Sequence, residues 1–427
     1  MKQFRYIAPG MLLVLIASPL VQARDFSARV SVVSAESDNA FKSTEDTIDE
    51  RQDAYVLSLT GNYANDFLTT EVNYTGSDER FAKASQEERR FLEGRSMLLL
   101  GALTDPADIE FKHSRTSLLS TPDAINLSNN QDERESLSVI PRLKKRVTAA
   151  DLLIASVDYT QIHFLKNDLN DSERSSAQFN WVHQSTQVSE LNFLVQRTDI
   201  GFDNFPDADY VYSSAVATYS TQLRKLSYTL AAGYNRSEPS TGDTYGSPTY
   251  ALSVAFKDPL NSLQLMLAQS ITDSSMENGN LAFVSPIIDG ESTYKVDQIK
   301  RRNASLSWGS NFICDKCSLS VSVHRGVDDY VVLPDEINIQ GASVAFTYNL
   351  SKRSAVSLRS SSSEQEFVGE LLGRDYTIDR TTLDYRYDFD GGFSLRFFAE
   401  QEERGSENNA TTYQETLLGG ELTWTIF

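Results

Sequence analysis

Residues 342–363 alternate between apolar and polar side chains with a period of two. Apolar residues stand at every second position before and after a short polar turn: Val344, Phe346, Tyr348, Leu350, Val356 and Leu358. Small or polar residues occupy most of the positions between them. A period of two is typical of a β-strand with one apolar and one polar face. The segment is therefore predicted to form a hairpin, which suits either a soluble sandwich or a membrane barrel.

The same pattern recurs along the chain as hairpins with short turns, separated by longer polar segments. The predicted short turns lie at 64–66, 105–106, near 150, near 186, near 223, within 251–268, around 314, within 348–358 and at 390–392. A first strand within 25–33 and a last strand within 417–427 bring the total to about 20 strands, or roughly 16 to 22 if doubtful strands are merged or split. The sequence thus predicts an all-β fold, a single transmembrane antiparallel up-and-down β-barrel.

The N-terminus has the pattern of a secretory signal. Two basic residues precede a short apolar run, and Val21 and Ala23 stand at the −3 and −1 positions of a cleavage site. The apolar run is much shorter than the roughly 20 residues of a spanning helix. We therefore predict a signal peptide over 1–23 and a mature barrel over 24–427, located in the cell outer membrane of a Gram-negative bacterium. A chain without a spanning helix crosses a membrane only as a closed barrel.

The formal net charge of −20 comes mainly from the longer segments between hairpins. The most acidic of these are 36–53, 77–94, 129–136 and 400–408. Outer-membrane barrels have short periplasmic turns and long extracellular loops, so we predict that the acidic segments are extracellular. They are either ordinary solvated loops, or loops that share divalent cations with lipopolysaccharide or repel anionic ligands. The acidic balance argues against a nucleic-acid partner. The predicted partners are outer-membrane lipid, lipopolysaccharide and the barrel-assembly machinery.

Aromatic residues gather near the short-turn ends of the predicted strands. Membrane barrels carry girdles of tryptophan and tyrosine at the lipid interface. The residues predicted to form such a girdle are Trp181, Trp308, Tyr348 and Trp424.

The opposite phase of the alternation supplies the predicted lining of the pore. Its charged members are Arg29, Glu71, Asp158, Arg359, Arg380, Asp384, Arg386, Arg396 and Glu400. Side chains of both signs are compatible with a hydrated wall in which charges pair across strands. They are equally compatible with a path for a charged polymer, in which arginines contact acidic sugar units. The sequence leaves both interpretations open.

The only two cysteines, Cys314 and Cys317, fall within one predicted periplasmic turn. Because that compartment is oxidising, we predict a small disulfide that stiffens the turn. A metal site would need a second pair of ligands, which the neighbouring sequence does not offer. We predict neither a metal nor a cofactor.

The chain offers few residues for catalysis. Its four histidines are His113, His163, His183 and His324. A hydrolase of the serine–histidine type needs a serine beside one of them on a neighbouring strand, and a third group that orients the imidazole. No such pairing stands out among the many serines, so we predict that the protein is not an enzyme.

The turn style supports a resemblance to a known family. The hairpin at 348–365 has an aromatic residue, Leu-Ser, a basic residue and Ser around its turn. In this style, in length and in its signal peptide, the chain resembles the PEP-CTERM (exosortase) system-associated outer-membrane β-barrel family of exopolysaccharide loci. The resemblance implies a pore or accessory component in the export or assembly of an extracellular polysaccharide, with polysaccharide and periplasmic export components as partners. The alternatives are a general or nutrient diffusion porin and a plugged structural or adhesive surface barrel.

Overall fold

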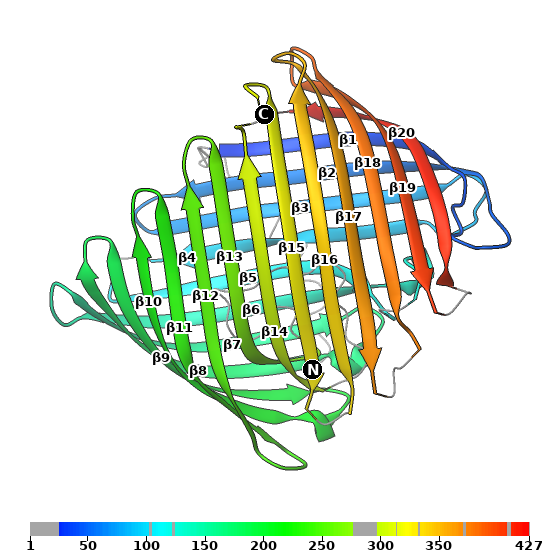
Figure 1. Cartoon of the computed structure of the whole chain (residues 1–427). Helices are drawn as coiled ribbons and strands as arrows, with labels where there is room; N and C mark the ends of the chain where they lie inside the picture. The colour runs from blue at the N-terminus through cyan, green and yellow to red at the C-terminus, as the bar shows by residue number, and fades with distance from the viewer. Residues whose placement is uncertain are drawn as a thin grey trace.

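The fold is known from a computed structural model of the whole chain (Figure 1). The structure describes residues 25–101, 105–121, 124–275, 297–312, 314–331, 334–369, 373–407 and 411–426. The predicted signal segment 1–23 lies outside these ranges. None of the described helices is long and apolar enough to cross a membrane.

The described chain forms 20 strands and three short 3₁₀ helices. The strands are β1 (Asp25–Ser37), β2 (Glu50–Ala64), β3 (Leu68–Phe81), β4 (Arg89–Leu100), β5 (Ala107–Leu119), β6 (Gln131–Arg146), β7 (Asp151–Phe164), β8 (Ser172–Thr186), β9 (Ser189–Phe202), β10 (Tyr210–Gln222), β11 (Leu226–Pro239), β12 (Tyr245–Lys257), β13 (Asn261–Asp273), β14 (Gln298–Ser310), β15 (Cys317–Tyr330), β16 (Glu336–Asn349), β17 (Ser354–Val368), β18 (Tyr376–Asp388), β19 (Phe393–Ser406) and β20 (Tyr413–Thr425). The 3₁₀ helices are η1 (Ser128–Asn130), η2 (Asp168–Asn170) and η3 (Pro206–Ala208).

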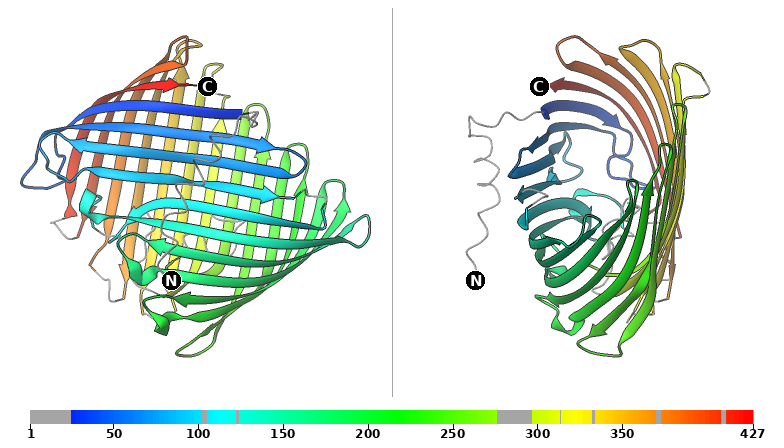
Figure 2. Two further views of the ribbon diagram at one scale, coloured as in Figure 1. Left: turned by 180° about the vertical axis from the view of Figure 1, so that it is seen from behind. Right: turned by 90° about the vertical axis from the view of Figure 1, so that its left-hand side faces the viewer.

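Each strand pairs antiparallel with the next one, and β1 pairs with β20, so the sheet closes on itself. Closure gives every described strand a neighbour on each side, as a barrel in lipid requires. Strands β13 to β19 form one wall, and β1 to β8 cross behind them at a large angle (Figures 1 and 2). The prediction of a single antiparallel barrel of about 20 strands is confirmed.

The two ends of the barrel differ in their connections. Short turns such as 258–260 and 389–392 join the strands at the end that also holds the start of β1 and the finish of β20; we call it the turn end. The opposite, loop end carries longer connections such as 38–49. The short turns are those predicted from the hairpin pattern.

Local chemistry explains why these turns are tight. The carboxylate of Asp258 accepts hydrogen bonds from the backbone N–H groups of Leu260 (2.9 Å) and Asn261 (2.8 Å). These bonds lower the pKa of the Asp258 carboxyl group because they stabilise its ionised form. In the β18–β19 turn, Gly391 and Gly392 have φ values of 82° and 81°, a region that favours glycine.

Apolar side chains point outward and polar ones point inward along the walls. Phe346 on β16 lies opposite Leu358 on β17 on the outer face. One position further along, the Thr347 and Ser357 hydroxyls hydrogen-bond at 3.1 Å on the inner face. Exposed apolar side chains of the outer face include Val32, Leu57, Leu230, Val323, Leu383 and Phe397. This outer face is the apolar band that a membrane barrel presents to lipid.

Much of the acidic sequence lies in strands. Strand β2 begins at Glu50, β3 extends to Phe81, β6 begins at Gln131 and β19 extends to Ser406, so that all four predicted acidic loop segments are partly strand. These carboxylates can lie in strands because they face basic side chains on the neighbouring strands and pair with them. Glu402 on β19, for example, lies opposite Arg380 on β18 and binds it. An acidic segment in this sequence therefore indicates both a loop and the loop-end part of the strands that flank it.

The facing of the wall predicts a pattern of chemical labelling. Single cysteines at Thr347 and Arg359 are expected to react with a water-soluble maleimide, because these positions face the hydrated interior. Cysteines at Phe346 and Leu358 are expected to resist it in the membrane-inserted protein. A charge introduced at Phe346 is expected to cost about 2 to 4 kcal/mol near the bilayer midplane, and less near the interface. Equal labelling of all four positions would contradict this facing.

Cys314 and Cys317 are joined by a disulfide in the β14–β15 turn. Their ring is small, so closing it removes little entropy from the unfolded chain. Replacement of both by serine is expected to lower stability only at the low end of the roughly 0 to 5 kcal/mol range of disulfides. The temperature at which the folded band disappears in detergent gels measures this effect. Loss of barrel assembly in the double variant would contradict the expectation.

Candidate solute pathway in the lumen

The turn-end half of the interior is lined by small polar side chains that are open to water. Ser320, Ser343 and Ser361 face inward from β15, β16 and β17, yet all three are exposed. The inward guanidinium groups of Arg359 and Arg386 are 57% and 61% exposed. Side chains that point into the barrel and remain exposed indicate a hydrated passage in this half.

The nine charged residues predicted to line the pore all lie in the inward phase of their strands. They are Arg29 on β1, Glu71 on β3, Asp158 on β7, Arg359 on β17, Arg380, Asp384 and Arg386 on β18, and Arg396 and Glu400 on β19. The structure brings together the members on β17 to β19. Arg29, Glu71 and Asp158 lie on other parts of the wall and join none of these pairs.

An alternating ladder of charges crosses β17 to β20. The carboxylate of Asp384 binds Arg359 at 3.1 Å and also binds Arg396. Arg396 reaches on to Glu421 at 3.4 Å. Neighbouring charges of opposite sign neutralise one another along this ladder. It is the paired, hydrated wall that was one of the two interpretations of the sequence.

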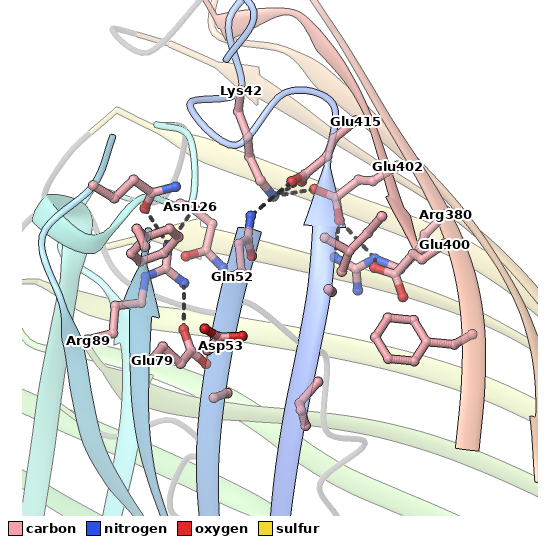
Figure 3. Close-up of a pocket in the computed structure, with 17 residues that line it drawn as sticks. Lys42, Gln52, Asp53, Glu79, Arg89, Asn126, Arg380, Glu400, Glu402 and Glu415 are labelled. Carbon is pink, nitrogen blue, oxygen red and sulfur yellow. Dashed lines mark hydrogen bonds and ion pairs between the residues drawn. The ribbon is translucent and has the colours of Figure 1, made fainter. Parts of the chain in front are cut away.

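Toward the loop end the lumen contains a cavity of about 350 Å³, which we call the mouth pocket. It lies between β1–β3 and β18–β20 and under the loops that follow β1, β3 and β5 (Figure 3). Its charged lining residues are Lys42, Asp53, Glu79, Arg89, Arg380, Glu400, Glu402 and Glu415. Within the described part of the chain, no three His, Cys, Asp or Glu side chains are grouped so as to hold a metal ion.

Glu402 is the centre of one side of the mouth pocket. Its carboxylate receives Lys42 Nζ at 2.7 Å, Arg380 Nε at 2.8 Å and the Tyr413 hydroxyl at 2.6 Å. Lys42 comes from the β1–β2 loop and also reaches Glu415 at 3.4 Å (Figure 3). The Glu402 side chain is only 6% exposed. A carboxylate with so little contact with water needs opposite charges nearby, and Lys42 and Arg380 supply them.

The other side of the pocket is held by contacts between loops. Arg89 Nη1 lies 3.7 Å from Glu79, and Arg89 Nη2 donates to the backbone carbonyl of Asn126 at 3.1 Å (Figure 3). Gln86 donates to the carbonyl of Ala40 at 2.6 Å. These bonds join the loops after β1, β3 and β5 and narrow the mouth of the barrel.

A second constriction joins strands from opposite walls. Arg174 on β8 donates from Nη2 to both carboxylate oxygens of Asp273 on β13, at 2.6 and 2.7 Å. Tyr210 also donates to Asp273, and the Ser172 and Ser275 hydroxyls meet at 3.0 Å. We call this group the cross-lumen clamp. In the described part of the sheet β8 pairs with β7 and β9 and not with β13, so the clamp spans the interior.

The clamp forms because the loop-end part of β13 leaves the wall. Pairing between β12 and β13 stops at Tyr250 opposite Gln269, while β13 stays paired with β14 as far as Asp273. Ile271 is thereby fully buried. It packs against residues of β9 and β10 on the facing wall: Ile200, Phe202, Tyr210 and Tyr212. Apolar burial and the ion pair together hold this constriction closed.

An apolar cluster fills a third part of the loop end. Its members are Ile299, Tyr330, Ile337, Ile339, Phe367 and Tyr376. Arg404 stacks over the Tyr376 ring at 3.9 Å and donates to the carbonyl of Ala124 in the β5–β6 loop at 3.3 Å. The interior is therefore hydrated at the turn end and constricted by side chains at the loop end.

Several residues of this narrow end were missed by the sequence analysis. Glu402 continues the inward phase of Arg396 and Glu400, so a longer alternation on β19 would have found it. Lys42 lies in a loop without a period, and Arg174 pairs with Asp273 only through the bend of β13. No sequence signal identifies Lys42, and none identifies Asp273 as the partner of Arg174.

The four predicted girdle aromatics lie on the outer face near the turn end. Trp181 donates from Nε1 to Asp151 at 3.0 Å, and Trp424 stacks on Phe393 with ring centroids 5.7 Å apart. Trp308 and Tyr348 are 38% and 37% exposed.

Comparison with known proteins extends the assignment of the fold. The sequence matches no protein-family model and no curated protein. The siderophore receptor PirA of Acinetobacter baumannii superposes with a TM-score of 0.51 at 10% identity, over 94% of this chain and 80% of that chain. A mutant of the ferric enterobactin receptor PfeA of Pseudomonas aeruginosa gives the same four values. OccK2 (OpdF) of Pseudomonas aeruginosa, solved in complex with glucuronate, superposes with a TM-score of 0.43 at 10% identity, over 95% of this chain and 99% of that chain. The chain thus has the fold of an outer-membrane β-barrel.

Proposed function

We propose that the protein is a diffusion channel for small polar solutes, with its selective constriction at the loop end. The observation that carries this proposal is the change in the lumen from an open, serine-lined half to a narrow half formed by the clamp, the apolar cluster and the mouth pocket. Barrels of 16 to 18 strands already leave room for water. In this barrel the restriction comes from side chains and bent strand ends.

The same observation bears on the polysaccharide role implied by the family resemblance. A polymer has to thread the whole lumen in an extended form, so the narrowest point limits it. The cross-lumen clamp buries Asp273 completely and Arg174 to 5% exposure, which leaves no space between those two strands. This favours small solutes over a polymer. The export role, and with it the polysaccharide partners, stays a prediction.

Liposome swelling tests the proposed function. Vesicles that contain the purified protein are expected to swell in solutions of a monosaccharide or a small amino acid, because these solutes carry water in with them. The rate is expected to fall sharply for oligosaccharides of four or more units, and vesicles without protein are the control. Absence of swelling with every small solute would favour a plugged structural barrel instead. Equal rates for short and long oligosaccharides would favour a wide export pore.

A further inference from the structure

The outer face of β3–β6 carries a chain of four polar side chains that the channel does not use. Ser96 on β4 and His113 on β5 are direct partners on neighbouring strands. His113 in turn lies opposite Leu137 on β6, whose side chain is exposed on the outer face. Tyr74 and Glu135 complete the chain from β3 and β6. All of these residues lie within the described ranges.

The hydrogen bonds of this chain run in one direction. Nε2 of His113 lies 2.8 Å from Glu135, and because a carboxylate only accepts, this nitrogen carries the proton. Nδ1 therefore has the free lone pair and accepts from the Tyr74 hydroxyl at 2.5 Å. The Tyr74 oxygen then accepts from Ser96 Oγ, which lies 3.2 Å away. The order of donation is Ser96 to Tyr74 to His113 to Glu135.

A glycine holds Tyr74 in place within this chain. Gly94 lies opposite Tyr74 and has a φ of 144°, which L side chains rarely adopt. A Cβ at this position would lie 2.7 Å from Tyr74 Cα and 2.8 Å from Tyr74 Cδ1. The absence of a side chain lets the Tyr74 ring lie along β4, where it is 5% exposed. Tyr74 thereby reaches both Ser96 and His113.

The chain lies at the boundary between the apolar band and the charged rim. On its turn-end side the outward residues are Leu98, Phe111 and Val139, and on its loop-end side Arg115 pairs with Glu133 at 2.5 Å. A change from apolar to ionic side chains along a barrel marks the level at which acyl chains meet head groups. The ester bonds of membrane lipids lie at this level.

We propose that this outer-face site hydrolyses an acyl ester of an outer-leaflet lipid, with Ser96 as the nucleophile. A hydroxyl, a base and a carboxylate that orients the base form the arrangement needed for acyl transfer. Here Tyr74 relays the proton between the hydroxyl and His113, and Glu135 fixes the tautomer of the imidazole. The proposal is independent of the channel, because the lumen lies on the other side of the wall.

The proposed reaction passes through an acyl ester on Ser96. Ser96 Oγ attacks the ester carbonyl carbon, its proton passes to Tyr74, and the Tyr74 proton passes to His113 Nδ1, which leaves an imidazolium beside Glu135. The bond between the acyl carbon and the alcohol oxygen breaks, and the proton returns through Tyr74 to that oxygen. Water then attacks the acyl-Ser96 ester by the same route, and releases the fatty acid and the free Ser96 hydroxyl.

An active-site probe tests the site directly. The folded protein in vesicles of phosphatidylethanolamine and phosphatidylglycerol is treated with a lipid-like fluorophosphonate, and peptide mass spectrometry locates the adduct. We expect the adduct on Ser96 and release of fatty acid from the vesicle lipid. Ser96→Ala is expected to abolish both. Tyr74→Phe and Glu135→Gln are expected to slow both by about 100-fold or more, the usual contribution of general acid–base catalysis.

His183→Gln is the matched control, because His183 also faces outward and hydrogen-bonds to an acid, Asp151, at 2.8 Å, and it lies at the turn end of β7 and β8, away from the site. It is expected to leave labelling and turnover unchanged. Heat-modifiable migration in gels shows that each variant is folded. Labelling of Ser96 is decisive. A folded wild-type protein in which the probe does not react at Ser96, or Ser96→Ala with unchanged fatty-acid release, overturns the proposal.

Discussion

Replacing Arg174 by alanine is expected to lower the free energy of unfolding of the barrel by about 3 to 5 kcal/mol, the range for breaking a buried ion pair from one side. Asp273 is fully buried, and without Arg174 its carboxylate would lose its only cation in the clamp. The remaining partners of Asp273 in the clamp, Tyr210 and Ser275, are neutral hydroxyls. Urea titration of the protein in lipid vesicles, followed by tryptophan fluorescence, measures the change.

Two further variants make this expectation specific. Arg353→Ala breaks an ion pair of similar length, 2.7 Å to Asp390, whose side chains are 52% and 84% exposed. It is expected to cost less than about 1 kcal/mol, because water screens the pair. The double variant Arg174→Met with Asp273→Leu replaces the clamp by apolar contacts and is expected to recover most of the loss. A loss for Arg174→Ala no larger than that for Arg353→Ala would contradict a closed clamp.

Replacing Glu402 by glutamine is expected to shift the ion selectivity of the channel toward anions, by at least about fivefold in the permeability ratio. The change keeps the shape of the side chain but leaves Lys42 and Arg380 with one carboxylate fewer in the mouth pocket. A unit charge about 4 Å from the path of an ion contributes about 1 kcal/mol even at the dielectric constant of water. The reversal potential in a salt gradient across a planar bilayer gives the ratio.

The control for this variant lies on the outer face. Glu238→Gln removes a carboxylate that is paired with Arg236 at 3.0 Å on the outward side of β11, also near the loop end. It is expected to leave the reversal potential unchanged. A shift of the same size in both variants would show that the general charge of the protein, and not the mouth pocket, sets the selectivity.

The strands could be predicted from the sequence because each wall separates lipid from water. In β16 and β17 this separation places Phe346 and Leu358 on one face and Thr347 and Arg359 on the other, and the period of two follows. Turn residues such as Gly391 and Gly392 then fix the hairpins. Period and turn chemistry are local properties, which is why the sequence alone predicts both the barrel and the inward phase of its charges.

Contacts between distant strands could not be predicted in this way. The alternation gives the face of Arg174 but not its partner, because Asp273 belongs to a strand end that leaves its neighbour and bends into the interior. Similarly, Ser96 and His113 are ordinary outward positions in the sequence. Only the register of β4 against β5 places them side by side. A period of two shows which face of the sheet a residue occupies, but it does not show which residue of the neighbouring strand lies opposite.

The central claim is that the lumen is hydrated at the turn end and constricted by side chains at the loop end, and polymer exclusion tests it most directly. Single-channel conductance is measured in a planar bilayer while polyethylene glycols of graded size are added to one side at a time. A cysteine at Lys352, in the β16–β17 turn, identifies the turn-end side by its labelling. We expect polymers of intermediate size to lower the conductance from the turn-end side and to have no access from the loop-end side. The same size limit from both sides, or passage of long polymers through the barrel, would contradict the account.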